Sequence, residues 1–385
     1  MTRLTANWLD RPETQAVCSA LTKSGGLALF VGGCVRNTLL GAPVRDIDIA
    51  TDVKPDQVIA LVEAAGLKAV RTGIDHGTIT VVSAGLPHEV TTFRRDVETD
   101  GRRAVVAFSK DVAEDAARRD FTMNALYATP EGEVMDPLGG LPDLQARRVR
   151  FIGLAQDRIR EDHLRSLRFF RFHAWYGDAA GGMDPDALAA IAAHLEGLHS
   201  LSRERVGAEM MKLLGAPDPA PSVASMRQIG VLQAILPGAD DTALGPLVHL
   251  CDSHDAVLRL AALGRGFDAA LRLSKADARR AAVLRAAAEE GDPGALGYRL
   301  GESEARAALT LRAALMGQPL ADADLDLART GARQTFPVSS GDLMPAISGP
   351  ALGETLRSLE AAWIASDFTL SRSDLLELSE QTKKG

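Results

Sequence analysis

The pattern of apolar residues changes near residue 115, and this change constrains the fold more than any other feature of the sequence. Before it, short apolar or β-branched runs such as Leu27–Val31, Thr78–Val82 and Glu89–Phe93 favour buried strands. After it, apolar residues recur at helical spacing, for example over 157–175. The sequence therefore predicts an α+β protein, with a small mixed β-sheet in the N-terminal part and an all-helical remainder.

Length and composition bound the class of protein. A chain of 385 residues is long enough for two or three domains, at roughly 150 residues each. The net charge of −8 excludes a uniformly basic surface for nucleic acid, although a local basic groove is compatible with it. Three widely separated cysteines exclude a disulfide framework, and no apolar run approaches the roughly 20 residues that span a bilayer. We therefore expect a cytoplasmic protein without a membrane partner.

Two carboxylates two residues apart, Asp46 and Asp48, give the strongest local signal, on a strand expected over Val44–Ile49. Side chains at this spacing share one face of a strand, and neighbouring carboxylates repel each other unless a cation lies between them. Carboxylate oxygens suit Mg²⁺, which also takes substrate phosphates as ligands. Glu89 begins a further strand and can add a third carboxylate. A solvated strand face is the alternative for the pair, and a plain strand-end charge for Glu89.

A pair of glycines precedes these aspartates. Gly32 and Gly33 open a helix expected over Val35–Leu40, and 13 residues separate Gly33 from Asp46. Backbone N–H groups at a helix start attract phosphate, and glycine lets a phosphate approach the backbone closely. Arg36 can add a charge-assisted contact. A simple tight turn is the alternative. The sequence contains neither a Walker motif nor a dinucleotide-binding glycine fingerprint, which excludes those two kinds of nucleotide site.

Arginines gather at two further places. Arg119 belongs to an adjacent pair ahead of an apolar segment, which suits a triphosphate or an ordinary exposed helix start. Between 147 and 171, eight arginines and three acidic residues give a local charge of +5. Residues at steps of three are expected to form one continuous ridge on a helix there: Asp162, Arg165, Arg168 and Arg171. An Asp–Arg pair offers a nucleobase the acceptor and donor groups of a partner base. A salt-bridged exposed helix is the alternative.

Taken together along the chain, these motifs resemble those of the class II tRNA nucleotidyltransferases and bacterial poly(A) polymerases. The resemblance covers roughly 27–215 and rests on LFVGGCVRNTLLG, RDIDIAT, RRDFTMNALY, EDHLRSLRFFRF and LSRERVGAEMMKLL. It implies a nucleotidyltransferase head with a five-stranded sheet, followed by a helical neck, body and tail. We assign the head to 1–130, the neck with base recognition to 131–215, and the body and tail, expected to bind tRNA, to 216–385.

The resemblance also implies a role for most of the candidate residues. Asp46 and Asp48 would hold two Mg²⁺ ions. Glu89, chosen from its strand position and not from the resemblance, stays a further candidate of the catalytic site. The nucleotide contacts would come from both head and neck: Gly32, Gly33, Arg36, Arg119, Asp162, Arg165, Arg168 and Arg171.

Some of these roles are specific. Arg119 would lie near the phosphates, and Asp162 with Arg165 would pair with the edge of cytosine or adenine. The sequence departs from the family pattern at Asn37, where the family has Asp after the arginine. Asparagine keeps an oxygen acceptor but carries no charge.

The implied activity is template-independent addition of CCA to the 3′ end of tRNA from CTP and ATP, by two-metal catalysis with release of pyrophosphate. A poly(A) polymerase is the nearest alternative, although only Lys383 and Lys384 stand where such enzymes often have a basic extension. An inactive RNA-binding relative would be expected to lack the aspartate pair. The segment Asp100–Arg103 lies in the loop needed for the final A and argues against an enzyme that adds only CC. No obligate protein partner is implied.

Overall fold

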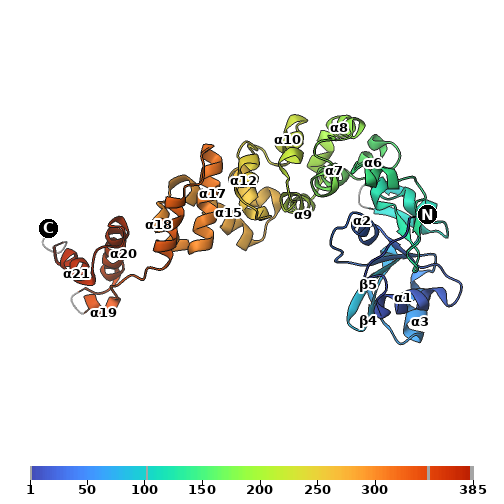
Figure 1. The fold of residues 1–385 in the computed structure, drawn as a ribbon, viewed down its shortest axis with the longest axis horizontal. Coiled ribbons are helices and arrows are strands. Elements are labelled where there is room, and N and C mark those ends of the chain that lie inside the picture. The colour runs from blue at the N-terminus through green and yellow to red at the C-terminus, as the bar shows by residue number, and fades with distance from the viewer. Residues whose placement is uncertain (1, 101–102, 345–346, 382–385) are drawn as a thin grey trace. The chain divides into compact units, whose positions relative to one another are not determined.

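A computed structural model describes residues 2–100, 103–344 and 347–381 of the chain (Figure 1). The chain forms two compact units, Met1–Ile235 and Leu236–Gly385. Within the described residues, all strands belong to the first unit and the second is helical, which confirms the predicted α+β class. The finer division at residues 130 and 215 stays a prediction. No helix in this described part combines the length and apolar character that a membrane span needs.

A mixed sheet forms the centre of the head. The strands before residue 136 are β1 (Leu29–Val31), β2 (Asp48–Thr51), β3 (Lys68–Gly73), β4 (Thr78–Ser83), β5 (Leu86–Thr92), β6 (Arg94–Asp100), β7 (Arg103–Phe108), β8 (Tyr127–Ala128) and β9 (Val134–Met135). In the described chain, seven of them form one sheet in the order β3-β4-β5-β2-β1-β8-β9, and β6 pairs with β7 separately. The resemblance predicted a five-stranded sheet, and this prediction is wrong because the sheet has seven strands. Strands β8 and β9 extend it, and each is too short to show an alternating pattern.

Helices cover this sheet and place the predicted glycine pair beside β1. They are α1 (Pro12–Thr22), α2 (Gly33–Leu39), α3 (Pro55–Ala64) and α4 (Val112–Ala117), with the 3-10 turns η1 (Ile74–His76) and η2 (Thr122–Asn124). Helices α1 and α3 contact each other and β4. Val17, Val62 and Ile79 are fully buried at these contacts, because each lies on the apolar face of its element.

After β9 the first unit continues with helices, through the neck and into the first part of the body. These are α5 (Leu141–Gln145), α6 (Ala155–Glu161), α7 (Leu164–Tyr176), α8 (Pro185–Ala192), η3 (Leu195–Ser200), α9 (Arg203–Leu214), α10 (Ala220–Gln228) and α11 (Val231–Ile235). A cluster of phenylalanines joins neck to head: the ring of Phe121 lies 5.0 Å from that of Phe151 and 4.9 Å from that of Phe172. This packing fixes α7 against the segment that follows α4.

The helical pattern over 157–175 is divided into α6 and α7. The chain turns to an extended conformation at Asp162, with φ −155° and ψ 105°, before α7 begins. The single ridge predicted from Asp162 to Arg171 is therefore wrong. Arg165, Arg168 and Arg171 share α7, but Asp162 lies at the break, where its Oδ1 accepts a hydrogen bond from the backbone N–H of Leu164 at 3.1 Å.

Two buried histidines should make the stability of the first unit depend on pH. The side chain of His88 on β5 lies 3.1 Å from Thr14 Oγ1, and that of His173 on α7 lies 3.2 Å from Ser222 Oγ. Burial lowers the pKa of both imidazoles below the ordinary value. The folded state then binds fewer protons than the unfolded chain at acid pH. The free energy of unfolding is therefore highest, as far as these histidines are concerned, above about pH 6.5. Below that pH it decreases by at most about 1.4 kcal/mol per pH unit for each histidine.

Urea unfolding of the first unit at pH 8 and pH 5.5 measures this effect. We expect a lower midpoint at pH 5.5, and a smaller difference between the two pH values in His88→Gln. A pH dependence that is unchanged in the variant would contradict a contribution from His88.

The second unit consists of helices around an alanine- and leucine-rich core. They are α12 (Leu244–Leu250), α13 (Ala256–Leu263), α14 (Asp268–Leu271), α15 (Lys275–Glu290), α16 (Pro293–Leu300), α17 (Glu302–Met316), α18 (Asp322–Ala332), α19 (Ser340–Leu343), α20 (Pro350–Ala365) and α21 (Arg372–Gln381). Leu284, Ala305 and Leu311 are completely buried in this core. A second cluster surrounds Trp363 on α20 and Leu375 on α21.

Glycines let α16 and α18 approach each other closely. A Cβ on Gly331 would lie 2.0 Å from the carbonyl oxygen of Gly294, far inside any real contact. We therefore expect Gly331→Ala to destabilise the second unit by about 1–3 kcal/mol through overpacking. Gly353→Ala on α20 is the matched control, because a Cβ there meets no atom within 4 Å, and it should be neutral or stabilising. Thermal unfolding of both variants measures the difference, and equal midpoints would refute the close approach.

Candidate nucleotide-binding and acidic site

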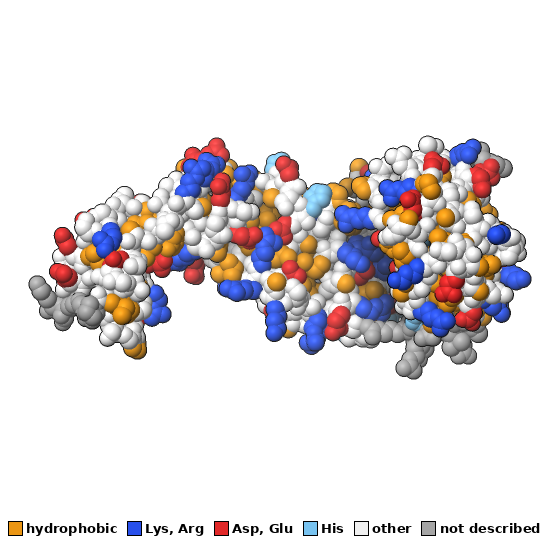
Figure 2. Space-filling model, turned by 90° about the horizontal axis from the view of Figure 1, so that it is seen from below, with side chains coloured by type: hydrophobic (Ala, Val, Ile, Leu, Met, Phe, Trp, Pro, Cys, Tyr) orange, Lys and Arg blue, Asp and Glu red, His pale blue; other side chains and the backbone are white. Residues whose placement is uncertain are grey.

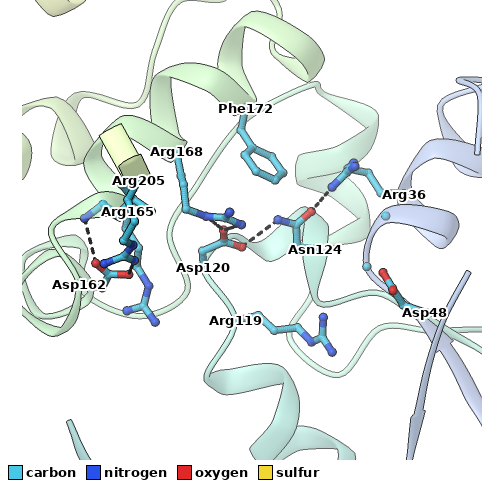
Figure 3. Close-up of a pocket in the computed structure, with 13 residues that line it drawn as sticks. Arg36, Asp48, Arg119, Asp120, Asn124, Asp162, Arg165, Arg168, Phe172 and Arg205 are labelled. Carbon is cyan, nitrogen blue, oxygen red and sulfur yellow. Dashed lines mark hydrogen bonds and ion pairs between the residues drawn. The ribbon is translucent and has the colours of Figure 1, made fainter. Parts of the chain in front are cut away.

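A cavity of about 410 Å³ lies in the first unit, where the head meets the neck helices (Figure 3). Its lining comes from α2, β2, the segment after α4, and the neck: Gly32, Gly33, Arg36, Asp48, Arg119, Asp120, Asn124, Asp162, Leu164, Arg165, Arg168, Phe172 and Arg205. The cavity brings together most of the residues singled out from the sequence. Asp46, Glu89 and Arg171 do not line it.

The acidic end of the cavity lies at the start of β2. This strand begins at Asp48, later than the strand expected from Val44, so Asp46 precedes it and is exposed. The alternation still holds, because Ile47 is buried and Asp48 is only half-buried. Asp48 pairs in parallel register with Glu89 of β5. Burial, with Glu89 and Asp46 adding repulsion, raises the pKa of the Asp48 carboxyl to about 6.

These acidic groups have the donor chemistry that Mg²⁺ requires. All are carboxylate oxygens, and the raised pKa of Asp48 reports a site where negative charge is destabilised by burial and by its acidic neighbours. A bound cation would relieve that destabilisation. Within the described residues, no group of three His, Cys, Asp or Glu side chains is close enough to hold a metal by itself.

The glycine pair forms the turn between β1 and α2. Gly32 adopts φ +68°, a left-handed conformation that favours glycine. A Cβ on Gly32 would lie 3.4 Å from Arg119 Nη1, so the turn also lies against this arginine. The next helical turn carries Arg36, which is buried beneath the cavity. Its guanidinium donates to Asn124 Oδ1 and, at 2.9 Å, to the hydroxyl of Tyr176, whose ring centroid lies 4.0 Å away.

Arg119 is held from two sides. Its Nε donates to the Tyr127 hydroxyl at 3.1 Å, and its Nη2 lies 3.0 Å from Asp115 Oδ2. Burial alone would lower the pKa of Arg119, but Tyr127 and Asp115 together raise it above its ordinary value, so the guanidinium stays charged. On the backbone side, Arg158 of α6 donates to the carbonyl oxygens of Arg118 and Arg119 at 2.5 and 2.7 Å. This positions the Arg119 peptide.

The neck side of the cavity contains four arginine–carboxylate pairs. Asp162 Oδ2 lies 2.5 Å from Arg205 Nη2 of α9, and Arg165 pairs with Glu161 rather than with Asp162. Arg171 does not line the cavity, and its Nε lies 2.5 Å from Glu209 Oε2 of α9. The fourth pair joins Arg168 to Asp120 (Figure 3). Figure 2 shows Lys and Arg side chains gathered beside the head, over the neck helices, as the local charge of +5 suggested.

Asp120 connects the pocket's two sides. Its Oδ2 accepts from Arg168 Nε at 2.7 Å, and its Oδ1 accepts from Asn124 Nδ2 at 2.8 Å. Burial would raise the pKa of this carboxyl, but Arg168 and the hydrogen bonds hold it below its ordinary value. Asn124 in turn accepts from Arg36.

The lining residues that the sequence did not indicate are Asp120, Asn124, Leu164, Phe172 and Arg205. Asp120 and Asn124 stand in RRDFTMNALY, and Arg205 in LSRERVGAEMMKLL, so the motifs contained them without assigning a role. Their spacing carries no signal, because each acts through a partner on another element. The predicted loop residues Gly101 and Arg102 lie outside the described residues.

Two segments of the first unit and its border match known family models. Residues 28–150 match the family model of the poly A polymerase head domain. Residues 182–242 match the model described as the probable RNA and SrmB-binding site of polymerase A.

Similar sequences include the mitochondrial CCA tRNA nucleotidyltransferase 1 of Homo sapiens, 42% identical over 186 residues, which cover 48% of this chain and 43% of the human protein. The CCA-adding enzyme of Geobacillus stearothermophilus is 40% identical over 228 residues, covering 59% of this chain and 54% of the relative. The matches thus span about half the length of these curated relatives.

One solved structure extends the similarity over the whole chain. The CCA-adding enzyme of Bacillus stearothermophilus in complex with CTP superposes with a TM-score of 0.76 and 28% identity, covering 97% of this chain and 99% of the solved chain. Head and neck sequence matches and full-length fold similarity agree with the motifs that the cavity assembles. The chain therefore contains a poly A polymerase head domain over 28–150 and the family's RNA-binding region over 182–242, and its fold is that of a CCA-adding enzyme.

Proposed function

We propose that this protein is a template-independent RNA nucleotidyltransferase that adds CCA to the 3′ end of tRNA from CTP and ATP, with release of pyrophosphate. One observation carries the proposal: a single cavity has an acidic end at Asp48 and a donor–acceptor edge at Asp162 and Arg165. The first suits phosphoryl transfer and the second suits the edge of a nucleobase. The names of the relatives, and the CTP complex of one of them, support the same substrates.

In the proposed reaction, the 3′-hydroxyl oxygen of the RNA attacks the α-phosphorus of the nucleotide. The bond from that phosphorus to the bridging oxygen breaks, pyrophosphate leaves, and the hydroxyl proton is lost to solvent. The turn at Gly32 and Gly33, with Arg119, binds the phosphates. Asp162 and Arg165 hold the base edge, and Arg36 and Arg168 complete the pocket. Arg171, which pairs with Glu209, orients α7 rather than touching the nucleotide.

Mg²⁺ would be held by Asp46 and Asp48, with Glu89 beside them, and when bound it supplies Lewis-acid stabilisation of the phosphate charge. For location, we propose the cytoplasm, since Cys18, Cys34 and Cys251 are all free thiols, as is usual in reducing compartments.

The test is incorporation of labelled CTP and ATP, with Mg²⁺, into tRNA transcripts that end before CCA, after C and after CC. We expect addition of C, C and A to the transcript that ends before CCA. The transcript that ends after C should gain C and A, and the one that ends after CC should gain A alone. ATP-only addition that continues past one residue on any RNA would identify a poly(A) polymerase. No incorporation on any transcript would leave an RNA-binding protein without this activity.

A further inference from the structure

Asn37 links the pocket to the loop that carries Asp46. Its Oδ1 accepts two hydrogen bonds from the neighbouring guanidinium, from Arg36 Nε at 3.1 Å and Nη2 at 2.8 Å. Its Nδ2 donates to the carbonyl oxygen of Pro43 at 2.7 Å. One half-buried amide therefore contacts both a cavity-lining arginine and the chain that leads to the exposed aspartate.

The backbone of Asn37 holds the same loop. Gly41 follows the end of α2 and adopts φ +68°. Its N–H donates to the carbonyl of Thr38 at 3.1 Å. The N–H of Ala42 donates to the carbonyl of Asn37 at 2.8 Å. These two bonds form a Schellman motif, the common way for a helix to end in a left-handed glycine. Asn37 thus anchors the start of the loop through both its main chain and its side chain.

The loop needs such anchors because Asp46 lies outside β2. Regular pairing begins at Asp48, and the bond from the N–H of Glu89 to the carbonyl of Ile47, at 3.0 Å, holds the far end of the loop. The position of the Asp46 carboxylate relative to Asp48 therefore depends on where the chain leaves α2. A shift of about 1 Å in a group that acts on the reacting atoms can cost on the order of 100-fold in rate.

An amide is the chemical group that suits both contacts. An ionised carboxylate at position 37 could still accept from Arg36, but it has no hydrogen to donate to Pro43. The partners through which the Arg36 side chain forms hydrogen bonds in the described structure, Asn37, Asn124 and Tyr176, are all neutral, so its charge is not cancelled by an ion pair. Asn37 therefore orients Arg36 without neutralising it.

We propose that Asn37 is a positioning residue, which fixes the loop carrying Asp46 relative to Arg36 and leaves the charge of Arg36 available to the phosphates of the nucleotide. The expected effect of Asn37 on the reaction rests on the proposed function. Its expected effect on the loop is independent of that function.

Two variants of the full chain separate the two contacts. Asn37→Asp keeps the acceptor for Arg36 and loses the donor to Pro43, whereas Asn37→Ala loses both. Amide hydrogen exchange without metal or nucleotide measures the loop directly, and we expect the amides of 42–47 to exchange at least about tenfold faster in both variants. Thr38→Ser, on the same helix, keeps its hydroxyl and should match the native protein.

Incorporation kinetics give the second measurement. We expect kcat to decrease by about 10- to 100-fold in both variants, because Asp46 is less well placed. KM for CTP should increase in Asn37→Ala, where Arg36 loses its orientation. In the native protein the charge of Arg36 is not paired, so KM for CTP should increase with salt concentration. In Asn37→Asp the new carboxylate pairs with Arg36, and this increase of KM with salt should be smaller. A merely structural role would lower the unfolding midpoint without changing this salt dependence.

The two claims fail in different ways. Native exchange rates over 42–47 in both variants would overturn the inference about Asn37, whatever the native protein adds to tRNA. Faster exchange in the variants, together with no incorporation by the native protein, would leave the anchoring of the loop intact and overturn the proposed function.

Discussion

Asp48→Asn should lower the rate of nucleotide incorporation by at least about a thousandfold and leave the first unit folded. The substitution keeps the shape of the side chain but removes the negative charge that the proposed Mg²⁺ site requires. Loss of roughly 4 kcal/mol of transition-state stabilisation corresponds to a factor of about a thousand. Burial and the neighbouring acids Glu89 and Asp46 make the charged form of Asp48 unfavourable in the folded protein. The variant should therefore have an equal or higher unfolding midpoint.

Incorporation rates and thermal unfolding of the same preparation check both parts of this prediction. Asp56→Asn, which removes an exposed carboxylate from the first turn of α3, is the control and should match the native protein in both measurements. An active Asp48→Asn would contradict the assignment of the acidic end. An inactive variant with a much lower midpoint would attribute the loss to unfolding instead.

Asp120→Ala should destabilise the first unit by about 3–5 kcal/mol, the usual effect of removing one member of a buried ion pair. The carboxylate accepts from Arg168 Nε at 2.7 Å, Asn124 Nδ2 at 2.8 Å and the N–H of Phe121 at 2.9 Å. Its removal leaves the Arg168 guanidinium without its main partner, since Glu209 lies 3.8 Å away. Asn124, and through it Arg36, also loses its orientation.

Urea unfolding of the first unit measures this loss. Asp157→Ala provides the comparison, because Asp157 forms an exposed ion pair with Arg160 at 3.1 Å on α6 and should contribute no more than about 1 kcal/mol. Similar effects of the two substitutions would show that Asp120 is not a supporting element of the pocket. We also expect the fraction of Asp120→Ala protein that stays folded to bind CTP more weakly than the native protein does.

The sequence predicted those elements whose pattern is local. The run Thr78–Val82 lies within β4, and Glu89–Phe93 overlaps β5, which ends at Thr92, because several alternating residues reveal a half-buried strand. Strands β8 and β9 have two residues each and leave no such pattern. The break between α6 and α7 was also missed, since apolar spacing continues through Asp162 and nothing local marks the extended residue.

The candidate site divides in the same way. Motifs identified Asp48, Arg36 and Arg165 because their spacing and charge are visible along the chain. The partner of each arginine was not predictable, because it depends on which helices face each other. Asp162 was expected to act with Arg165, but its ion pair is with Arg205, 43 positions away on α9.

The four neck-side pairs have a consequence for redesign of the pocket. Arg165, Arg168, Arg171 and Arg205 each lie beside a carboxylate, and Glu161 is shared between Arg165 and Arg158. Interchanging the two members of one pair, for example Asp162 and Arg205, would reverse the hydrogen-bonding polarity at one spot and keep the sum of charges constant. If these residues read the base as proposed, such an exchange would change the donor and acceptor contacts at one place on this wall without changing its total charge.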